Sequence, residues 1–276
     1  MSNNSALEKN VQASEDTSAT SAQSQCALNT SEYCARTIIR VIAIVASIYG
    51  MTASWEGLKT FTYFTNLSNV MICVALAGSL LLDTASFMRT KNTETSATME
   101  NNTWLDTKSN AWYVFKFMMT ISIAVTFTLY LCFLAPTNKL GFVGAYMNNG
   151  CSSLCVHAVT PLLAIADFVL FDYRFRSTNA HLLASTIPPL TYVAYADLLG
   201  AFAGVRWGDH AMRAPYNFLN YDAPAGWFGF APHTFNATTL GVGVAYLLVV
   251  FTLIFIGVGK IFLVLKDARA RSIFND

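Results

Sequence analysis

A threonine and a histidine, each near the start of a long apolar run, are the residues of this chain that could act together as a nucleophile and a base. Thr65 lies in the segment Phe61-Thr62-Tyr63-Phe64-Thr65-Asn66-Leu67-Ser68-Asn69, and His157 opens the segment His157-Ala158-Val159-Thr160-Pro161. A threonine hydroxyl is a weak nucleophile unless a base takes up its proton, and histidine is the usual base. The pair predicts attack on an ester carbonyl, with an acyl-enzyme as the intermediate.

Three further polar residues fit a supporting role in that chemistry. Ser68 and Asn69 lie one helical turn after Thr65 on the same helix face, so either could orient the attacking group or donate to an oxyanion. Asp197 lies near the end of a later apolar run, in the layer predicted for Thr65 and His157. Its alternative interpretation is an acid at the membrane edge that faces water.

The same residues also have a purely structural interpretation. Ser and Thr in membrane helices bond back to the carbonyl four residues earlier, and Asn joins helices to one another. An intramembrane His indicates function by default, but it can also be a hydrogen-bonded clasp. Pro161 frees the backbone carbonyl of His157 and predicts a kink that opens space beside the imidazole. The residues alone leave both interpretations open.

The composition places these runs in a membrane. Of the 276 residues, 54% are hydrophobic and 12% are charged, whereas soluble domains carry roughly 25% charged residues. Six apolar runs approach the roughly 20 residues that cross a bilayer as a helix, and they lie at 36–54, 61–82, 111–135, 151–171, 182–203 and 239–265. The predicted fold class is an all-α, polytopic membrane helix bundle with six transmembrane helices. Pro188-Pro189 makes the fifth run the weakest of the six.

Polar segments flank the predicted bundle. Residues 1–34 are rich in Ser, Thr, Asn and Gln, which predicts a disordered tail because such a segment buries little apolar surface. Residues 35–266 form the predicted transmembrane domain, and residues 267–276 a short basic cytoplasmic tail. The loop 83–110 is polar and predicted to be mobile.

Basic residues predict the orientation of the bundle. Six spans put both termini on one side, where eleven Lys and Arg residues fall, against four on the other side. Arg36 and Arg40 are among the eleven, while Lys116 lies inside an apolar run and is interpreted as a snorkelling residue. The imbalance predicts cytoplasmic termini. If the protein is microbial, we expect it in the plasma membrane. Thr65 and His157 then lie about 6 and 9 Å below the outer surface.

The other acids do not complete a catalytic triad. Asp167 lies about 15 Å further along its helix than His157, so it cannot orient the imidazole directly. It is predicted to bond another helix or a polar group near the cytoplasmic side. Asp172 and Arg174 are predicted to be interfacial charges.

No motif in the chain indicates a cofactor, a metal or a nucleic acid. Aromatic residues fill the loop from about 204 to 238, which predicts an aromatic belt or a lid over a lipid-binding cavity. His210 and His233 of that loop lack metal-ligand spacing, and phosphate-binding and dinucleotide-binding motifs do not occur. The net charge of +1 and the scattered basic residues do not favour nucleic acid.

Three segments in a fixed order resemble a known family. They are Tyr63-Phe64-Thr65-Asn66-Leu67-Ser68-Asn69, then His157-Ala158-Val159-Thr160-Pro161 with Asp167-Phe168-Val169-Leu170-Phe171, then Ala214-Pro215-Tyr216-Asn217-Phe218-Leu219. Over roughly residues 36–265 the chain resembles the androgen-induced gene one-like and androgen-dependent TFPI-regulating proteins, in particular their microbial branch. The resemblance implies a membrane hydrolase of fatty acid esters of hydroxy fatty acids, with Thr65 as nucleophile and His157 as its partner. The His157–Pro161 spacing and the N-terminal tail depart from the animal members.

The sequence therefore predicts a hydrolase for a membrane lipid or lipid-like ester, with a lipid-facing cavity towards the outer leaflet. One alternative is a carrier or binder of a small amphipathic molecule, which uses the same polar cluster without acylation of Thr65. Another is a structural membrane protein, in which Thr65→Val is tolerated without loss of any ligand or activity.

Overall fold

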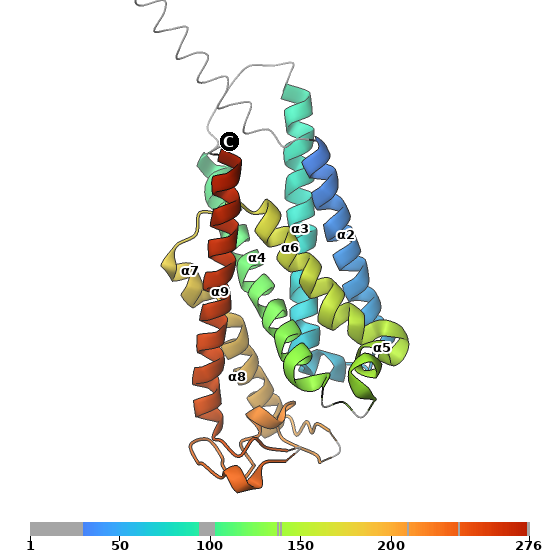
Figure 1. Cartoon of the computed structure of the whole chain (residues 1–276), viewed down its shortest axis with the longest axis vertical. Coiled ribbons are helices and arrows are strands. Elements are labelled where there is room, and N and C mark those ends of the chain that lie inside the picture. The colour runs from blue at the N-terminus through green and yellow to red at the C-terminus, as the bar shows by residue number, and fades with distance from the viewer. Residues whose placement is uncertain are drawn as a thin grey trace, which may run out of the picture.

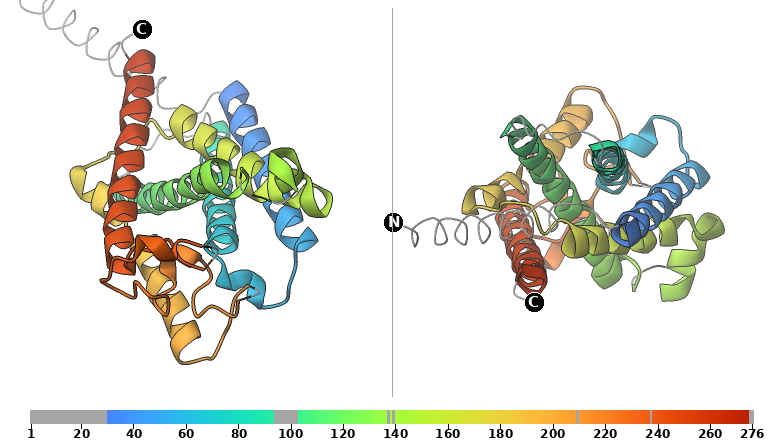
Figure 2. Two further views of the ribbon diagram at one scale, coloured as in Figure 1. Left: turned by 60° about the horizontal axis from the view of Figure 1, so that its bottom comes forward. Right: turned by 90° about the horizontal axis from the view of Figure 1, so that it is seen from above.

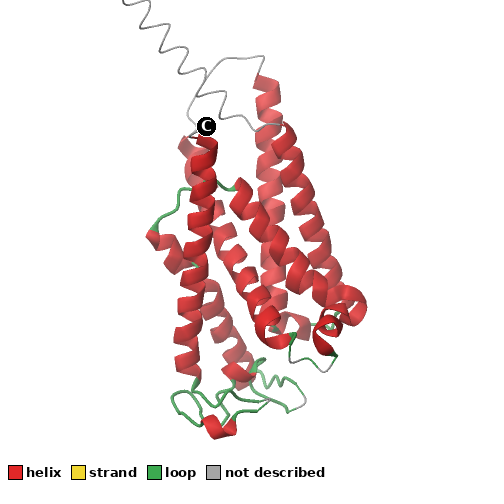
Figure 3. Cartoon of the chain, in the orientation of Figure 1, coloured by secondary structure: helices red, strands yellow, loops and turns green. Residues whose placement is uncertain are grey.

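The computed structural model describes residues 30–93, 103–136, 138, 140–208, 210–236 and 238–274. Within these ranges the regular structure is helical and contains no strands (Figure 3), which confirms the predicted all-α class. Six helices are long and apolar enough to span a membrane, as predicted. In chain order the helices are α2 (Thr30–Ala53), η1 (Lys59–Thr62), α3 (Phe64–Thr93), α4 (Thr103–Leu129), η2 (Tyr130–Leu134), α5 (Gly141–Leu154), η3 (Cys155–Val159), α6 (Thr160–Phe171), α7 (Asn179–Ala184), α8 (Ile187–Ala201), η4 (Asn217–Leu219), η5 (Pro232–Thr234) and α9 (Val244–Phe274).

The long helices run between two ends of one bundle (Figures 1 and 2). The terminal end is the end at which α2 begins and α9 finishes, and the loop end is the end that carries the segment 202–243. Helix α2 packs on α3 and α6, α4 packs on α3 and α6, α9 packs on α4 and α6, and α8 packs on α4. Which end faces the cytoplasm stays a prediction.

The bundle is apolar inside and outside. Phe117, Phe168 and Phe255 join α4, α6 and α9, and a second cluster with Ile72 and Met119 joins α3 to α4. Large apolar side chains also cover the outer faces of the long helices. In water such a surface would aggregate, whereas in a bilayer it contacts lipid.

Helix α2 extends into the predicted tail. It begins at Thr30, so residues 30–34 are helical, and residues 1–29 lie outside the described residues. At the other end of the chain, α9 continues to Phe274 through most of the predicted tail 267–276. Hydropathy marks the part of a helix that suits lipid, while the backbone hydrogen bonds continue through polar residues beyond it.

The predicted loop 83–110 is also largely helical. Helix α3 continues to Thr93 and α4 begins at Thr103, while residues 94–102 lie outside the described residues. The fifth run, predicted to be interrupted, consists of α7 and α8. Its prolines lie in the first turn of α8, where a missing N–H group leaves no helical bond unmade.

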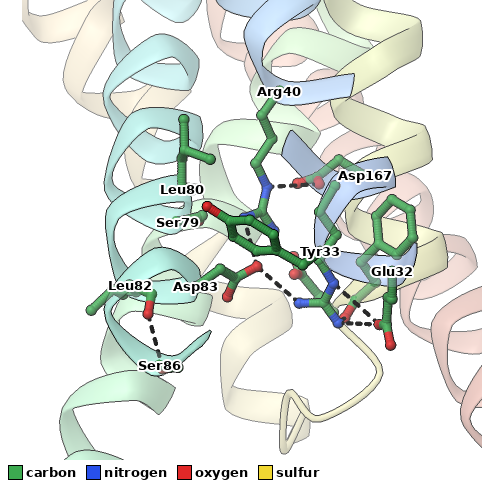
Figure 4. Close-up of polar contacts among 12 residues, drawn as sticks. Glu32, Tyr33, Arg40, Ser79, Leu80, Leu82, Asp83, Ser86 and Asp167 are labelled. Carbon is green, nitrogen blue, oxygen red and sulfur yellow. Dashed lines mark hydrogen bonds and ion pairs between the residues drawn. The ribbon is translucent and has the colours of Figure 1, made fainter. Parts of the chain in front are cut away.

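A network of buried ion pairs joins α2, α3 and α6 at the terminal end (Figure 4). Nε of Arg40 lies 2.8 Å from Oδ1 of Asp167, and Nη1 of Arg40 lies 2.7 Å from Oδ2 of Asp83. Nη1 of Arg36 lies 3.0 Å from the same oxygen of Asp83. Arg36 also pairs with Glu32, which is partly exposed. The prediction that Asp167 bonds another helix is confirmed.

Helix α4 joins this network through Lys116. Its Nζ forms an ion pair with Asp167 and lies 2.7 Å from Oδ2 of Asp172, and all three side chains are fully buried. The prediction that Lys116 snorkels was wrong, and so was the prediction that Asp172 is an interfacial charge. Both are buried because each neutralises the other, and an unpaired buried charge would be far more costly.

The network also changes the interpretation of two residues that contributed to the predicted orientation. Arg36 and Arg40 are buried among carboxylates and do not face solvent. Without them, nine basic residues still fall on the predicted cytoplasmic side against four on the other.

Candidate active site

An apolar cavity lies at the loop end between α3, α4, α8 and α9. Its walls include Leu129, Val193, Leu248, Phe251 and Phe255. Its volume of about 90 Å³ is several times the roughly 10–15 Å³ that one water molecule needs. None of the described side chains that line it carries a permanent charge. Such a cavity suits an apolar ligand that is held by a few polar groups.

Thr65 and His157 both line this cavity. Thr65 is the second residue of α3, which begins directly after Tyr63, and the extended backbone of Tyr63 (φ −97°, ψ 136°) separates η1 from α3. His157 lies in η3, where the α5–α6 segment forms a π-helical turn. The structure thus brings the two residues, 92 positions apart in the sequence, to one apolar site.

The π-helical turn positions His157 and leaves a backbone carbonyl without a helical partner, to which Asn69 donates. The Thr160 N–H bonds the carbonyl of Cys155, five residues back. In that register Pro161, which has no N–H, frees the carbonyl of Val156, and Nδ2 of Asn69 donates to it at 3.1 Å. The sequence predicted a freed carbonyl at His157, which stays a prediction; the π-helical register frees the carbonyl of Val156 as well.

Stacking on Tyr130 holds the imidazole of His157. The two ring centroids are 3.6 Å apart and the rings are nearly parallel, at 10°. The Tyr130 hydroxyl donates to the carbonyl of Ala145 at 2.8 Å, which fixes the stacking partner. Nδ1 of His157 is buried and has no hydrogen-bond partner among the described residues. The ring of Tyr130 thus fixes the plane of the imidazole, while the position that a triad carboxylate would have at Nδ1 is taken by no described residue.

Tyr216 connects the segment 202–243 to the candidate nucleophile. Its hydroxyl oxygen accepts a hydrogen bond from the backbone N–H of Phe64 at 3.1 Å. Burial raises the pKa of Tyr216, and hydrogen bonds from Thr65 act in the opposite direction. No sequence pattern assigned this tyrosine a role, although it belongs to one of the three segments that carry the family resemblance. Only the fold shows that it contacts the start of α3.

Ser68 and Asn69 join helices and are not among the cavity-lining residues. The hydroxyl of Ser68 donates to the Thr65 carbonyl of its own helix at 2.9 Å and lies 3.4 Å from the hydroxyl of Thr126 on α4. The Asn69 amide donates to the carbonyls of Thr65 and Val156, and its oxygen accepts from Ser47 at 3.0 Å. These contacts fit the structural interpretation of both residues, because they occupy both amide hydrogens of Asn69.

Asp197 lies on α8 outside the lining of the cavity. Its Oδ1 is buried and has no hydrogen-bond partner in the part of the chain that the structure describes. Burial raises the pKa of Tyr221 in the segment 202–243, and the charge of Asp197 raises it further. The structure thus associates Asp197 with the segment 202–243 and not with Thr65.

The first turn of α3 supplies an alternative to Asn69 as an oxyanion donor. The backbone N–H groups at a helix start have no partners within the helix, and they carry partial positive charge. Here the N–H of Phe64 points at the hydroxyl oxygen of Tyr216, next to Thr65. An oxyanion formed at Thr65 would develop close to these donors.

Comparison of the chain with family models, with curated proteins and with solved structures finds no match.

Proposed function

We propose that this integral membrane protein hydrolyses lipid-like esters, with Thr65 as nucleophile and His157 as base. The observation that carries the proposal is that these two residues, from different spans, line one apolar cavity. Apolar walls suit an acyl chain, and a Thr–His pair suits acyl transfer. The family resemblance favours the same two residues. The bias of basic residues favours cytoplasmic termini, which would place the cavity in the outer half of the membrane.

The proposed reaction has two steps. His157 takes the proton of the Thr65 hydroxyl as its oxygen bonds to the ester carbonyl carbon, and the carbonyl becomes an oxyanion. The bond to the alcohol oxygen then breaks, the alcohol leaves with the proton from His157, and an acyl-Thr65 ester remains. Water, with its proton taken by His157, releases the acid and restores both residues.

In the proposed mechanism, the described contacts correspond to a resting site. The Thr65 side chain lies close enough to the Tyr216 hydroxyl to act on its pKa, and Nδ1 of His157 has no hydrogen-bond partner among the described residues. Catalytic hydrogen bonds often shorten only when substrate binds. A substrate carbonyl at the start of α3 would compete with Tyr216 for the N–H donors and release the Thr65 hydroxyl towards the cavity.

The test is covalent labelling of purified protein in detergent with a fluorophosphonate probe. Wild type is compared with Thr65→Ala and His157→Ala, and mass spectrometry locates the adduct. An adduct on Thr65 that is lost in both variants while both stay folded supports the proposal. Absence of labelling in folded wild type contradicts it.

The matched control is Thr252→Ala. Thr252 lines the same cavity, but its hydroxyl donates to the Leu248 carbonyl of its own helix at 2.7 Å. Labelling of Thr65 is expected to persist in this variant. Loss of labelling in Thr252→Ala as well would indicate a general disturbance of the cavity and not loss of a nucleophile.

One observation favours a carrier or binder as the second candidate. Nothing described bonds Nδ1 of His157, and the neutral Tyr216 lies beside the Thr65 hydroxyl. A carrier would keep these contacts and bind an amphipathic molecule without a covalent step. Reversible binding of a lipid to folded wild type, without any adduct on Thr65, would favour this candidate.

A further inference from the structure

The cavity has a roof at the loop end. Tyr216, Phe218 and Leu219 line the cavity from the segment 202–243. The rings of Tyr216 and Phe218 are parallel, with centroids 5.0 Å apart, and Phe218 lies 5.0 Å from Phe251 of α9. The Tyr216 hydroxyl is tied to the start of α3. These contacts close the direct route from the loop end for a bulky ligand.

The side of the cavity is less covered. Among the residues that line the cavity, only Leu134 and Leu190 have largely exposed side chains, with 48% and 46% exposure. A side chain that lines a cavity and is also exposed at the surface lies at the mouth. Leu134 ends η2 and Leu190 lies in the first turn of α8, so the mouth lies between these two helices.

The surface around this mouth is apolar. Leu131 on η2, and Leu183 and Ile187 next to Leu190, are exposed at 36%, 66% and 55%. All these residues belong to, or directly adjoin, helices that are long and apolar enough to span a membrane. The mouth therefore faces the hydrocarbon of the bilayer and not water.

The two edges of the mouth lie at different depths, because Leu134 is two residues beyond the end of its span at Cys132, whereas Leu190 lies well inside the span Asn179–Ala201. Leu190 is eleven residues from Ala201, the end of α8, which corresponds to about 16 Å along the helix. That distance is about half of the roughly 30 Å hydrocarbon core. A chain that entered here would lie with its apolar part at mid-depth and its ester closer to Thr65 and the loop end.

We propose that Leu134 and Leu190 frame a lateral portal through which the acyl chain of an uncharged lipid ester enters the cavity from the bilayer. The inference rests on the proposed function for the identity of the ligand as an ester. The portal itself requires only that a lipid binds in the cavity. The uncharged lining selects against a ligand whose charged group would have to enter the cavity, because a charge in such a site has no partner.

The experiment uses the full chain in phosphatidylcholine vesicles that contain a fatty acid alkyl ester with a diazirine in mid-chain. After irradiation, mass spectrometry quantifies adducts on cavity residues such as Val193 and Phe255. Leu190→Trp fills the mouth and is expected to lower these adducts about tenfold, which corresponds to about 1.4 kcal/mol. Leu198→Trp is the matched control, since Leu198 is exposed on the same helix at 57% and does not line the cavity.

Leu134→Trp narrows the mouth from the other helix and provides the same test if Leu190→Trp does not fold. Equal cavity labelling in the two portal variants and in Leu198→Trp would overturn the portal, as would adducts confined to the outer face of wild type. Labelling needs no hydrolysis, so it is repeated in Thr65→Ala. If the portal variants lose cavity adducts but fluorophosphonate never labels Thr65, the portal stands and the hydrolase does not.

Discussion

The two ends of the bundle differ in whether their buried polar groups have partners. At the terminal end three buried cations meet three carboxylates, namely Arg36, Arg40 and Lys116 with Asp83, Asp167 and Asp172. At the loop end Thr65 and His157 line an apolar cavity, and Nδ1 of His157 has no described partner. Polar groups with all their partners hold helices together, whereas groups that lack partners in a cavity are available to a ligand. A polar residue in a span is therefore informative about function only once its partners are known.

The largest effect is expected from removal of the base at the loop end. His157→Gln should lower the rate of fluorophosphonate labelling of Thr65 about 10²–10⁴-fold, the usual contribution of a general base. The thermal unfolding midpoint should fall modestly, because the stacking of the imidazole on Tyr130 is lost, although Nδ1 has no described hydrogen bond to lose. His233→Gln, at an exposed position in the segment 202–243, is the control. An unchanged rate in His157→Gln would remove His157 from the mechanism.

The next effect should appear at the terminal end, on stability and not on labelling. Arg40→Leu leaves Asp167 and Asp83 with less positive charge and is expected to destabilise the fold by about 3–5 kcal/mol. The midpoint of thermal unfolding in detergent measures this, and Arg269→Leu, exposed on α9, is the control. A stable Arg40→Leu protein that no longer labels at Thr65 would show that the network serves the site.

Asn69 bonds the backbone carbonyls of both Thr65 and Val156. Its substitution tests whether it stabilises the fold or takes part in catalysis. Asn69→Ala leaves the Val156 carbonyl without its donor and should destabilise the fold by about 1–3 kcal/mol. Folded molecules should still label at Thr65 at close to the wild-type rate. The reverse result, normal stability with a large loss of rate, would make Asn69 the oxyanion donor that its position in the sequence predicts.

The smallest expected effect is a pH dependence of the terminal end. Burial raises the pKa of Asp172, just beyond α6, to about 6, although Lys116 acts in the opposite direction. An unfolded Asp titrates near 3.9. The stability that the raised pKa contributes is therefore fully present below about pH 3.9 and is lost as the pH rises through about 6. The protein should be about 1 kcal/mol more stable at pH 5 than at pH 7.

Thermal unfolding at the two pH values measures this difference, and Asp172→Asn should abolish it. The carboxylate of Asp167 and the ammonium of Lys116 face Asp172 in the network and remain in that variant. If Asp172→Asn retains the full pH dependence, another group of the chain is responsible.

The six spans and the all-helical class follow from the sequence because hydrophobic length is a local property. A run of about 20 apolar residues predicts a membrane helix whatever its neighbours are. Helix ends are not encoded in the same way, and for that reason α2, α3 and α9 extend into segments that composition predicts to be tail or loop.

Local composition also singled out Thr65 and His157, since polar groups are rare in such runs. The partners of these residues depend on the fold, because they lie far away in the chain. Arg40 and Asp167 are 127 positions apart, and Phe64 and Tyr216 are 152 apart. No local pattern indicates that Lys116 neutralises Asp172, that Asn69 bonds Val156, or that Tyr216 reaches the start of α3. Packing of distant helices decided which polar residues are structural and which line the cavity.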